Sequence, residues 1–156
     1  MEIERKFLIN EMPNLSEYES KKLVQGYLNT HPTVRVRKED DEYYLTYKGK
    51  AQNMIAREEY NLPLTKEAFE HLLPKCDGNI ISKTRYLIPI GKNAEGSNLT
   101  AELDVFDPPF APLSFAEVEF PTIEEANSFV KPKWLGEDVT DRKEYYNSYM
   151  SEQKFD

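Results

Sequence analysis

The chain has 156 residues, a length typical of one domain that buries its own hydrophobic core. It has 20 lysines and arginines against 28 aspartates and glutamates, a formal net charge of −8, so we do not expect its surface as a whole to bind nucleic acid. A single cysteine, Cys76, excludes an internal disulfide and a cysteine-based zinc site, and two histidines do not support a Ser-His-Asp or Cys-His catalytic arrangement.

Eight segments alternate apolar and polar residues and are rich in β-branched or aromatic side chains, which predicts β-strands. In chain order these segments are 2–9, 22–28, 33–38, 42–48, 55–63, 80–90, 99–106 and 115–120. Turn-forming residues such as Pro32, Gly49 and Gly91 separate them. The pattern indicates a β-rich α+β protein.

Three helices are predicted from their capping residues. Thr65 can cap a helix that runs to about Leu73, and Thr122 with Glu125 fits a capping box for a second one. Thr140 can cap a last helix, in which Tyr145, Tyr146, Tyr149 and Met150 recur at helical spacing. We expect this last helix to complete the outer core rather than to close one end of a space that the strands enclose. No repeat or linker interrupts the chain, so residues 1–156 are predicted to form a single domain.

Charged side chains recur on one face of the predicted strands. Because side chains alternate between the two faces of a strand, Glu2, Glu4 and Lys6 share one face of the first strand. The cations placed in this way are Lys6, Arg35, Arg37, Lys48, Arg57, Lys83 and Arg85. The acids placed in this way are Glu2, Glu4, Glu59, Glu102, Asp104, Glu117 and Glu119.

This pattern has two interpretations. The charges can lie on the solvated face of an open sheet, but such a face usually mixes charges with Ser, Thr, Asn and Gln. Here charges of like sign stand two residues apart on several strands, and they repel each other unless ligands of opposite sign lie between them. We therefore favour a closed barrel whose lumen holds an acidic patch for a metal ion and a basic patch for a polyanion.

A series of short motifs runs in order along almost the whole chain. It opens with Glu2-Ile3-Glu4-Arg5-Lys6 and continues with 25–27, 34–37, 45–49, 57–60, 83–86, 102–106, 116–120, 134–140 and Lys143. In sequence and order these motifs resemble the CYTH superfamily of triphosphate tunnel metalloenzymes, and in particular its short bacterial members. The resemblance implies an eight-stranded antiparallel closed barrel that forms a tunnel, with a few outer helices.

The resemblance also implies an activity. The leading expectation is metal-dependent hydrolysis of a triphosphate, inorganic tripolyphosphate above all, with Mg²⁺ or Mn²⁺ as cofactor. The first alternative is a class IV adenylate cyclase that makes cAMP and pyrophosphate from ATP. A thiamine or nucleoside triphosphatase is a further alternative, and a non-catalytic polyphosphate-binding module is the alternative outside the enzyme class.

Residue roles follow from the same resemblance. The residues expected to bind the phosphates are Lys6, Arg35, Arg37, Lys48, Arg57, Lys83 and Arg85. The residues expected to hold the metal are Glu2, Glu4, Glu117 and Glu119, with Glu59, Glu102 and Asp104 in a supporting layer or at a second metal. Tyr27 and Lys48 match the family's catalytic base pair, although Tyr27 can equally be one of many tyrosines that pack a β-rich core.

The expected partner is a small polyanionic substrate, either tripolyphosphate or a nucleotide or thiamine triphosphate, and neither nucleic acid nor a membrane. The chain begins with a charged strand, and no apolar run approaches the roughly 20 residues that span a bilayer. We therefore expect a cytoplasmic protein, and the sequence does not indicate its oligomeric state.

Overall fold

The strands form one continuous antiparallel sheet in the computed structural model, which describes residues 1–53 and 55–155; the last residue of the predicted domain, Asp156, lies outside them. The strand order is β5-β4-β3-β2-β6-β7-β8-β1-β9. The strands are β1 (Glu2–Ile9), β2 (Glu19–Thr30), β3 (Thr33–Glu39), β4 (Glu42–Ala51), β5 (Ala56–Pro63), β6 (Asp77–Lys92), β7 (Asn98–Phe106), β8 (Ser114–Glu119) and β9 (Leu135–Asp138).

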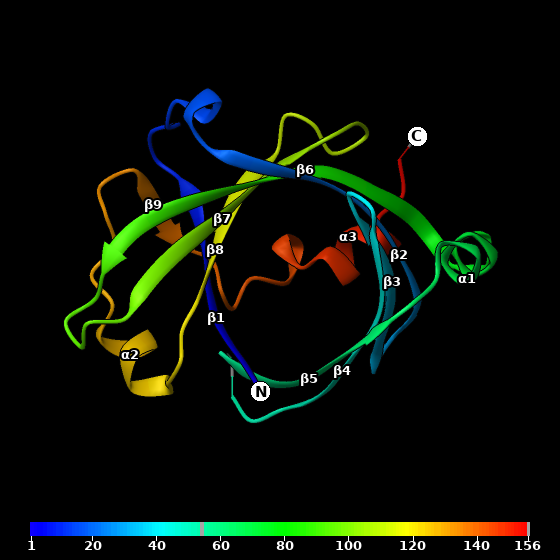
Figure 1. The fold of residues 1–156 in the computed structure, drawn as a ribbon, viewed down its shortest axis with the longest axis horizontal. Helices are drawn as coiled ribbons and strands as arrows, with labels where there is room; N and C mark the ends of the chain where they lie inside the picture. The colour runs from blue at the N-terminus through cyan, green and yellow to red at the C-terminus, as the bar shows by residue number, and fades with distance from the viewer. Residues whose placement is uncertain (54, 156) are drawn as a thin grey trace.

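The sheet closes on itself because β1 also pairs with β5. Glu2 is the register partner of Arg57, Ile3 is the partner of Ala56, and the Glu4 amide donates to the Ile55 carbonyl at 3.0 Å. On its other edge β1 pairs with β8 from Glu4 onward. The strands therefore surround a common interior, as Figure 1 shows, and the predicted eight-stranded closed antiparallel barrel is confirmed.

The ninth strand, β9, was not predicted. It pairs with the second half of β1, where Phe7 faces Asp138 and Ile9 faces Leu135. Its four residues are too few to show alternation, so pairing with β1 defines it. The strands β2 and β6 also extend beyond their predicted bounds, because their polar ends continue to pair with each other and with the neighbouring strands β3 and β7.

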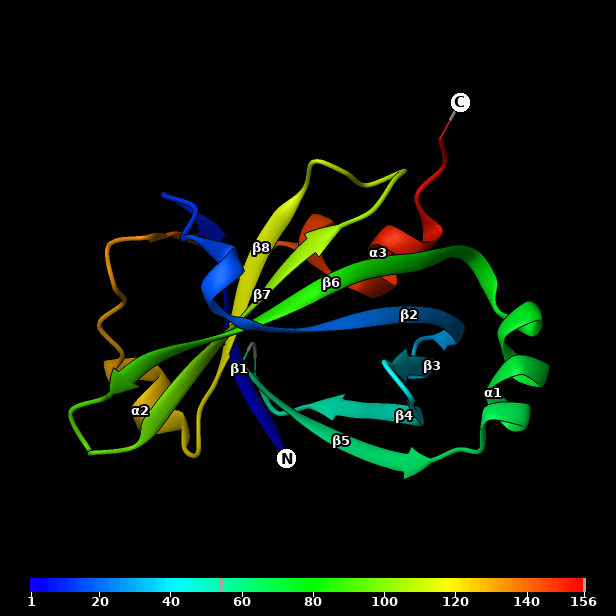
Figure 2. The same ribbon diagram turned by 45° about the horizontal axis from the view of Figure 1, so that its top comes forward.

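The helices and 3-10 turns connect the strands. They are α1 (Lys66–Leu72), α2 (Ile123–Ser128), α3 (Asn147–Glu152), η1 (Leu15–Glu17), η2 (Leu73–Lys75) and η3 (Lys143–Tyr145). The two predicted caps at the first helices are confirmed, because the Thr65 hydroxyl accepts from the Ala68 amide and the Thr122 hydroxyl accepts from the Glu125 amide, each at 3.1 Å. Figure 2 shows α1 and α2 on opposite sides of the barrel.

The predicted cap at Thr140 was wrong. Its hydroxyl accepts from the backbone amide of Lys6 at 3.0 Å, and its own amide donates to Asp138, so the residue ties the chain to β1 instead of starting a helix. The last helix, α3, begins seven residues later, at Asn147. It lies within the ring of strands and not outside it, contrary to the expected place in the outer core (Figure 1).

The hydrophobic core has two parts. Outside the barrel wall, the fully buried Phe7 and its neighbours on β7 and β8 pack beneath the segment that contains α2. At one end of the barrel interior, Met150 of α3 packs against Tyr27, Ile81 and Phe115. The remaining interior carries charged side chains. None of the helices in the described part of the chain is long and apolar enough to cross a membrane.

Candidate functional site

The barrel encloses a cavity of about 710 Å³, which is within the usual size range of small-molecule sites. Every residue assigned to the site from the sequence lines this cavity except Asp104. Asp104 is fully buried behind the cavity wall, where it contacts the cations of β6. Strand alternation was therefore a sound guide to which side chains face the lumen.

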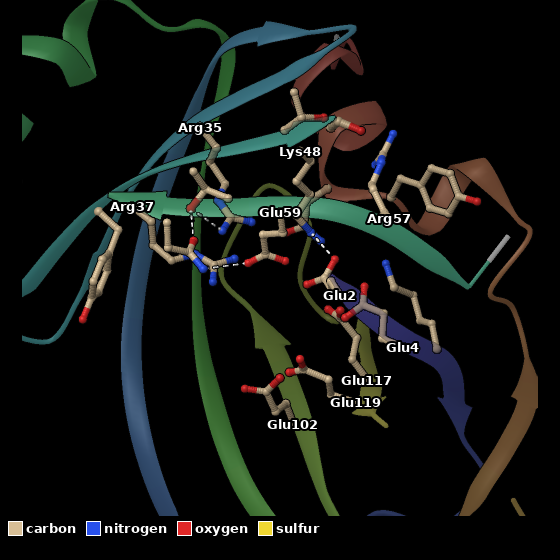
Figure 3. Close-up of a pocket in the computed structure, with 18 of the residues that line it drawn as sticks. Glu2, Glu4, Arg35, Arg37, Lys48, Arg57, Glu59, Glu102, Glu117 and Glu119 are labelled. Atoms are coloured by element: carbon tan, nitrogen blue, oxygen red, sulfur yellow. Dashed lines mark hydrogen bonds and ion pairs between the residues drawn. The ribbon is translucent and has the colours of Figure 1, made fainter. Parts of the chain in front are cut away.

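The strand register decides which charges become neighbours. Glu117 of β8 lies opposite Lys6 of β1 on one side and opposite Glu102 of β7 on the other. Glu119 lies opposite Glu4. Acids from β1, β7 and β8 therefore gather on one side of the lumen, whereas Arg35, Arg37 and Lys48 come from β3 and β4, as Figure 3 shows.

The basic side of the lumen carries uncompensated positive charge. Arg35 is only 6% exposed, and its single hydrogen bond in the described structure runs from Nη2 to Thr46 Oγ1 at 3.2 Å, which leaves its Nε without a partner. Arg37 donates from Nε to Gln25 Oε1 at 2.7 Å and pairs with Glu39 at 3.2 Å. Burial, together with the positive charge of Arg35, lowers the pKa of Arg37 to about 10.

The two cations of β6 are neutralised by a carboxylate that is buried in the barrel wall. Asp104 accepts from Lys83 Nζ at 2.8 Å and from two nitrogens of Arg85 at 2.8 and 2.9 Å. Burial would raise the pKa of Asp104, but these two cations outweigh burial and lower it. Burial lowers the pKa of Lys83 to about 7 in spite of Asp104. Asp104 thus holds Lys83 and Arg85 in place without facing the cavity itself.

On the acidic side of the lumen, negative charges are buried close to one another. Burial and the neighbouring Glu117 raise the pKa of Glu4 well above its ordinary value. Burial and a hydrogen bond with Glu59 raise the pKa of Glu2 to about 7, although Lys48 Nζ donates to Glu2 Oε1 at 3.0 Å. Burial and the neighbouring carboxylates thus outweigh the positive charge of Lys48 at both Glu2 and Glu4.

A divalent cation fits this chemistry. Carboxylate oxygens are the ligands that Mg²⁺ and Mn²⁺ prefer, and a cation would relieve the burial and the mutual repulsion that raise the pKa values of Glu2 and Glu4. Within the described residues, no three His, Cys, Asp or Glu side chains stand together as a ready metal cage.

The two residues expected to form the catalytic base, Tyr27 and Lys48, border the cavity but are not hydrogen-bonded to each other in the described structure. Tyr27 lines the cavity and is 4% exposed, and it packs in the apolar cluster around Met150. Lys48 is bonded to Glu2, and among the described residues no hydrogen bond links Lys48 to Tyr27. Both residues nonetheless border the same cavity.

Sequence reasoning missed three uncharged residues of the site. Gln25 and Thr46 contact the arginines of β3, and Asn147 of α3 contacts Gln25 and Lys83. Gln25 stands two residues before Tyr27 on the same strand face, so alternation could have identified it. Nothing in the sequence pattern places Asn147 in the lumen, because the position of α3 depends on the whole barrel.

Comparison with known proteins gives consistent results. The family model of the CYTH domain matches residues 1–154. An inorganic triphosphatase of Nitrosomonas europaea is 39% identical over 154 residues, which is 96% of each chain. An inorganic triphosphatase of Acetivibrio thermocellus is 36% identical over 152 residues, with 96% of this chain and 92% of that protein covered.

Solved structures agree with these sequence matches. The crystal structure of the inorganic triphosphatase NE1496 superposes with a TM-score of 0.68 at 36% identity, covering 99% of this chain and 96% of the other. A putative adenylate cyclase of Bacillus halodurans superposes with a TM-score of 0.50 at 14% identity, covering 100% of this chain and 94% of the other. This second likeness concerns the fold alone.

The charge imbalance predicts opposite effects of two substitutions on stability. Asp104→Asn leaves Lys83 and Arg85 buried without a full counter-charge, and we expect it to lower the free energy of unfolding by about 3–5 kcal/mol. Arg35→Met removes a buried cation that has no carboxylate partner, so we expect an unchanged or higher free energy of unfolding. Urea unfolding of both variants measures the difference, and a larger loss in Arg35→Met would contradict the assignment.

Proposed function

The chain belongs to the CYTH family, and on that basis we propose that it hydrolyses inorganic tripolyphosphate to pyrophosphate and orthophosphate with the aid of a divalent metal ion. The curated relatives that support this proposal are named inorganic triphosphatases, and they align over nearly the whole chain. The proposal concerns the cavity inside the barrel.

One observation carries the proposal. Arg35 and Arg37 are buried side by side with more positive charge than the described residues neutralise, while burial and neighbouring carboxylates raise the pKa of Glu2 and Glu4 across the same cavity (Figure 3). A polyanion that carries a divalent cation would satisfy both sides at once. Tripolyphosphate bound to a metal ion is such a ligand, because it bears several negative charges and phosphate oxygens that can bridge to the metal.

The proposed roles follow from the position of each group. Arginines offer paired N–H donors to phosphoryl oxygens, and lysines offer a point charge. The residues proposed to bind the phosphates are Lys6, Arg35, Arg37, Lys48, Arg57, Lys83 and Arg85. The residues proposed to hold the metal are Glu2, Glu4, Glu117 and Glu119, supported by Glu59, Glu102 and Asp104.

Catalysis by such a site is mainly positioning and charge stabilisation. Hydrolysis of a phosphoanhydride requires little covalent chemistry from the protein, because charge accumulates on oxygens that the cations already contact. When bound, the metal ion would neutralise phosphoryl charge and lower the pKa of a coordinated water. Lys6, Arg35, Arg37, Lys83 and Arg85 are buried, and their low-dielectric surroundings strengthen these interactions.

Tyr27 is proposed as the group that accepts the proton of the attacking water, with Lys48 as the neighbouring cation that assists it. Lys48 Nζ donates to Glu2 Oε1 at 3.0 Å, and Lys48 borders the same cavity as Tyr27. An ammonium close to a phenol favours the phenolate, which can act as a general base.

The preference for tripolyphosphate over ATP rests on the walls of the cavity. Its lining is dominated by charged side chains, and an adenine needs an apolar or aromatic pocket with directed hydrogen bonds. The cyclase, thiamine or nucleoside triphosphatase and binding-module alternatives are therefore outcomes of the first assay. The choice between Mg²⁺ and Mn²⁺, the single domain 1–156 and the cytoplasmic location stay predictions.

The first test compares tripolyphosphate and ATP as substrates. We expect rapid release of orthophosphate from tripolyphosphate with Mg²⁺ or Mn²⁺, and little turnover of ATP, because the lumen binds phosphates and not a base. Phosphate, pyrophosphate and cAMP are measured in parallel. Release of cAMP and pyrophosphate from ATP would make the protein a cyclase, and tight binding without turnover of any triphosphate would make it a binding module.

Glu4→Gln tests the metal side. Because burial and Glu117 raise the pKa of Glu4, a divalent cation that binds there displaces protons, so its affinity rises with pH. We expect Glu4→Gln to bind the cation more weakly, to release fewer protons, and to lose at least about 10²-fold in kcat. Titration calorimetry in two buffers of different ionisation enthalpy measures the protons. Arg37→Ala is the control: it should keep cation binding and raise KM for tripolyphosphate about tenfold or more.

Tyr27→Phe tests the proposed base. Loss of the phenol should lower kcat by about 10²-fold at saturating metal, with a smaller change in KM. Steady-state kinetics on tripolyphosphate provide the measurement. Tyr47→Phe is the matched control, because Tyr47 is 37% exposed on β4 and does not line the cavity. A kcat equal to that of the unchanged protein would remove Tyr27 from the mechanism.

A further inference from the structure

We propose that Asn147, the first residue of α3, is a positioning residue that sets the orientation of two phosphate-binding cations, Lys83 directly and Arg37 through Gln25. The proposal rests on the proposed function for the identity of the ligand, but the contacts that carry it belong to the described structure. It assigns the C-terminal helix a part in the site beyond closing one end of the barrel.

The contacts form an unbroken chain from α3 along three neighbouring strands of the barrel wall, β6, β2 and β3. Asn147 Oδ1 accepts from Lys83 Nζ at 3.0 Å and from Gln25 Nε2 at 3.0 Å. Gln25 Oε1 in turn accepts from Arg37 Nε at 2.7 Å. Gln25 is fully buried and Lys83 is 1% exposed, so water does not replace these partners. One amide oxygen on α3 therefore links a cation of β6 to a cation of β3.

The chain of hydrogen bonds has a definite direction. Arg37 can only donate, so Gln25 must present its oxygen to Arg37 and its NH₂ group to Asn147. Asn147 must then present its oxygen, which also serves the ammonium of Lys83. If the Asn147 oxygen is removed, Gln25 has a buried donor without an acceptor, and its amide is no longer held against Arg37. A change at Asn147 thus reaches Arg37 without touching it.

The helix that presents Asn147 is fixed by contacts outside the cavity. Asn79 Nδ2 donates to the Met150 carbonyl at 3.1 Å and to the Gln153 carbonyl at 2.6 Å. Gly78, which has φ of 71°, runs so close to α3 that any Cβ there would collide with the Ser151 carbonyl oxygen. Met150 is buried in the apolar cluster at the end of the lumen. Changes on β6 outside the cavity can therefore move Asn147.

The test compares binding and turnover of tripolyphosphate by Asn147→Ala and by Tyr149→Ala. Tyr149 is 51% exposed on the same helix, so its substitution controls for general effects on α3. We expect Asn147→Ala to raise KM, and the Kd of tripolyphosphate measured by calorimetry without metal, by about tenfold, with kcat and the melting temperature changed far less. Tyr149→Ala should leave KM and the Kd of tripolyphosphate unchanged.

A second pair of variants approaches the same residue from outside the cavity. Gly78→Ala should displace α3 and raise KM in the same way as Asn147→Ala. Gly91→Ala is its matched control, since Gly91 has φ of 87° and a Cβ there would meet nothing within 4 Å, so it carries the backbone strain alone. If Gly78→Ala does not fold, Asn147→Ala still decides the question.

Each outcome has a distinct meaning. A KM and Kd of Asn147→Ala within about twofold of the unchanged protein, or an equal rise in Tyr149→Ala, would overturn the positioning role. Failure of the unchanged protein to hydrolyse tripolyphosphate would overturn the proposed function instead. The calorimetric Kd would then still test whether Asn147 controls anion binding.

Discussion

The pairing of the first residues of β1 with β5 is the constraint on which the rest of the structure depends. This short seam, formed by Glu2 with Arg57 and Ile3 with Ala56, converts an open sheet into a barrel. Without it the lumen face would be solvated, and its charges would be screened by water. Closure buries the same strand that carries Glu2 and Glu4, and burial raises the pKa of both. The step that completes the fold therefore also creates the electrostatic conditions of the site.

The barrel can bury many charged side chains because some of them neutralise each other within its wall. Asp104 neutralises Lys83 and Arg85 within the wall, so these cations are held by the protein itself. Among the described residues no carboxylate is bonded to Arg35, and Glu4 lies among other carboxylates. Buried charges of this kind cost stability, and a ligand that satisfies them should stabilise the fold as it binds. They are the residues for which we propose a role in binding a metal-bound polyanion.

The C-terminal segment contacts both the first strand and the charged lumen of the barrel. It crosses β1, where Thr140 accepts from the Lys6 amide, and then enters the ring of strands as α3. There the Tyr145 carbonyl accepts from Lys6 Nζ at 2.6 Å, and Asn147 accepts from Lys83. Met150 seals the end of the lumen with apolar packing. A single segment therefore fills one end of the barrel with apolar packing and contacts cations on two different strands, β1 and β6.

The amino-acid sequence by itself determined eight of the nine strands of the described structure, most of the charged side chains that face the lumen and the first two helix caps, because alternation and capping are local properties of the chain. Only the tertiary structure decided which of those side chains meet. It paired Lys48 with Glu2 and not with Tyr27, used Thr140 to hold β1 and not to cap a helix, and brought Asn147 into the site. These contacts join residues 46, 134 and 64 positions apart in the chain. Such partners depend on strand register and on closure of the barrel, which no local pattern encodes.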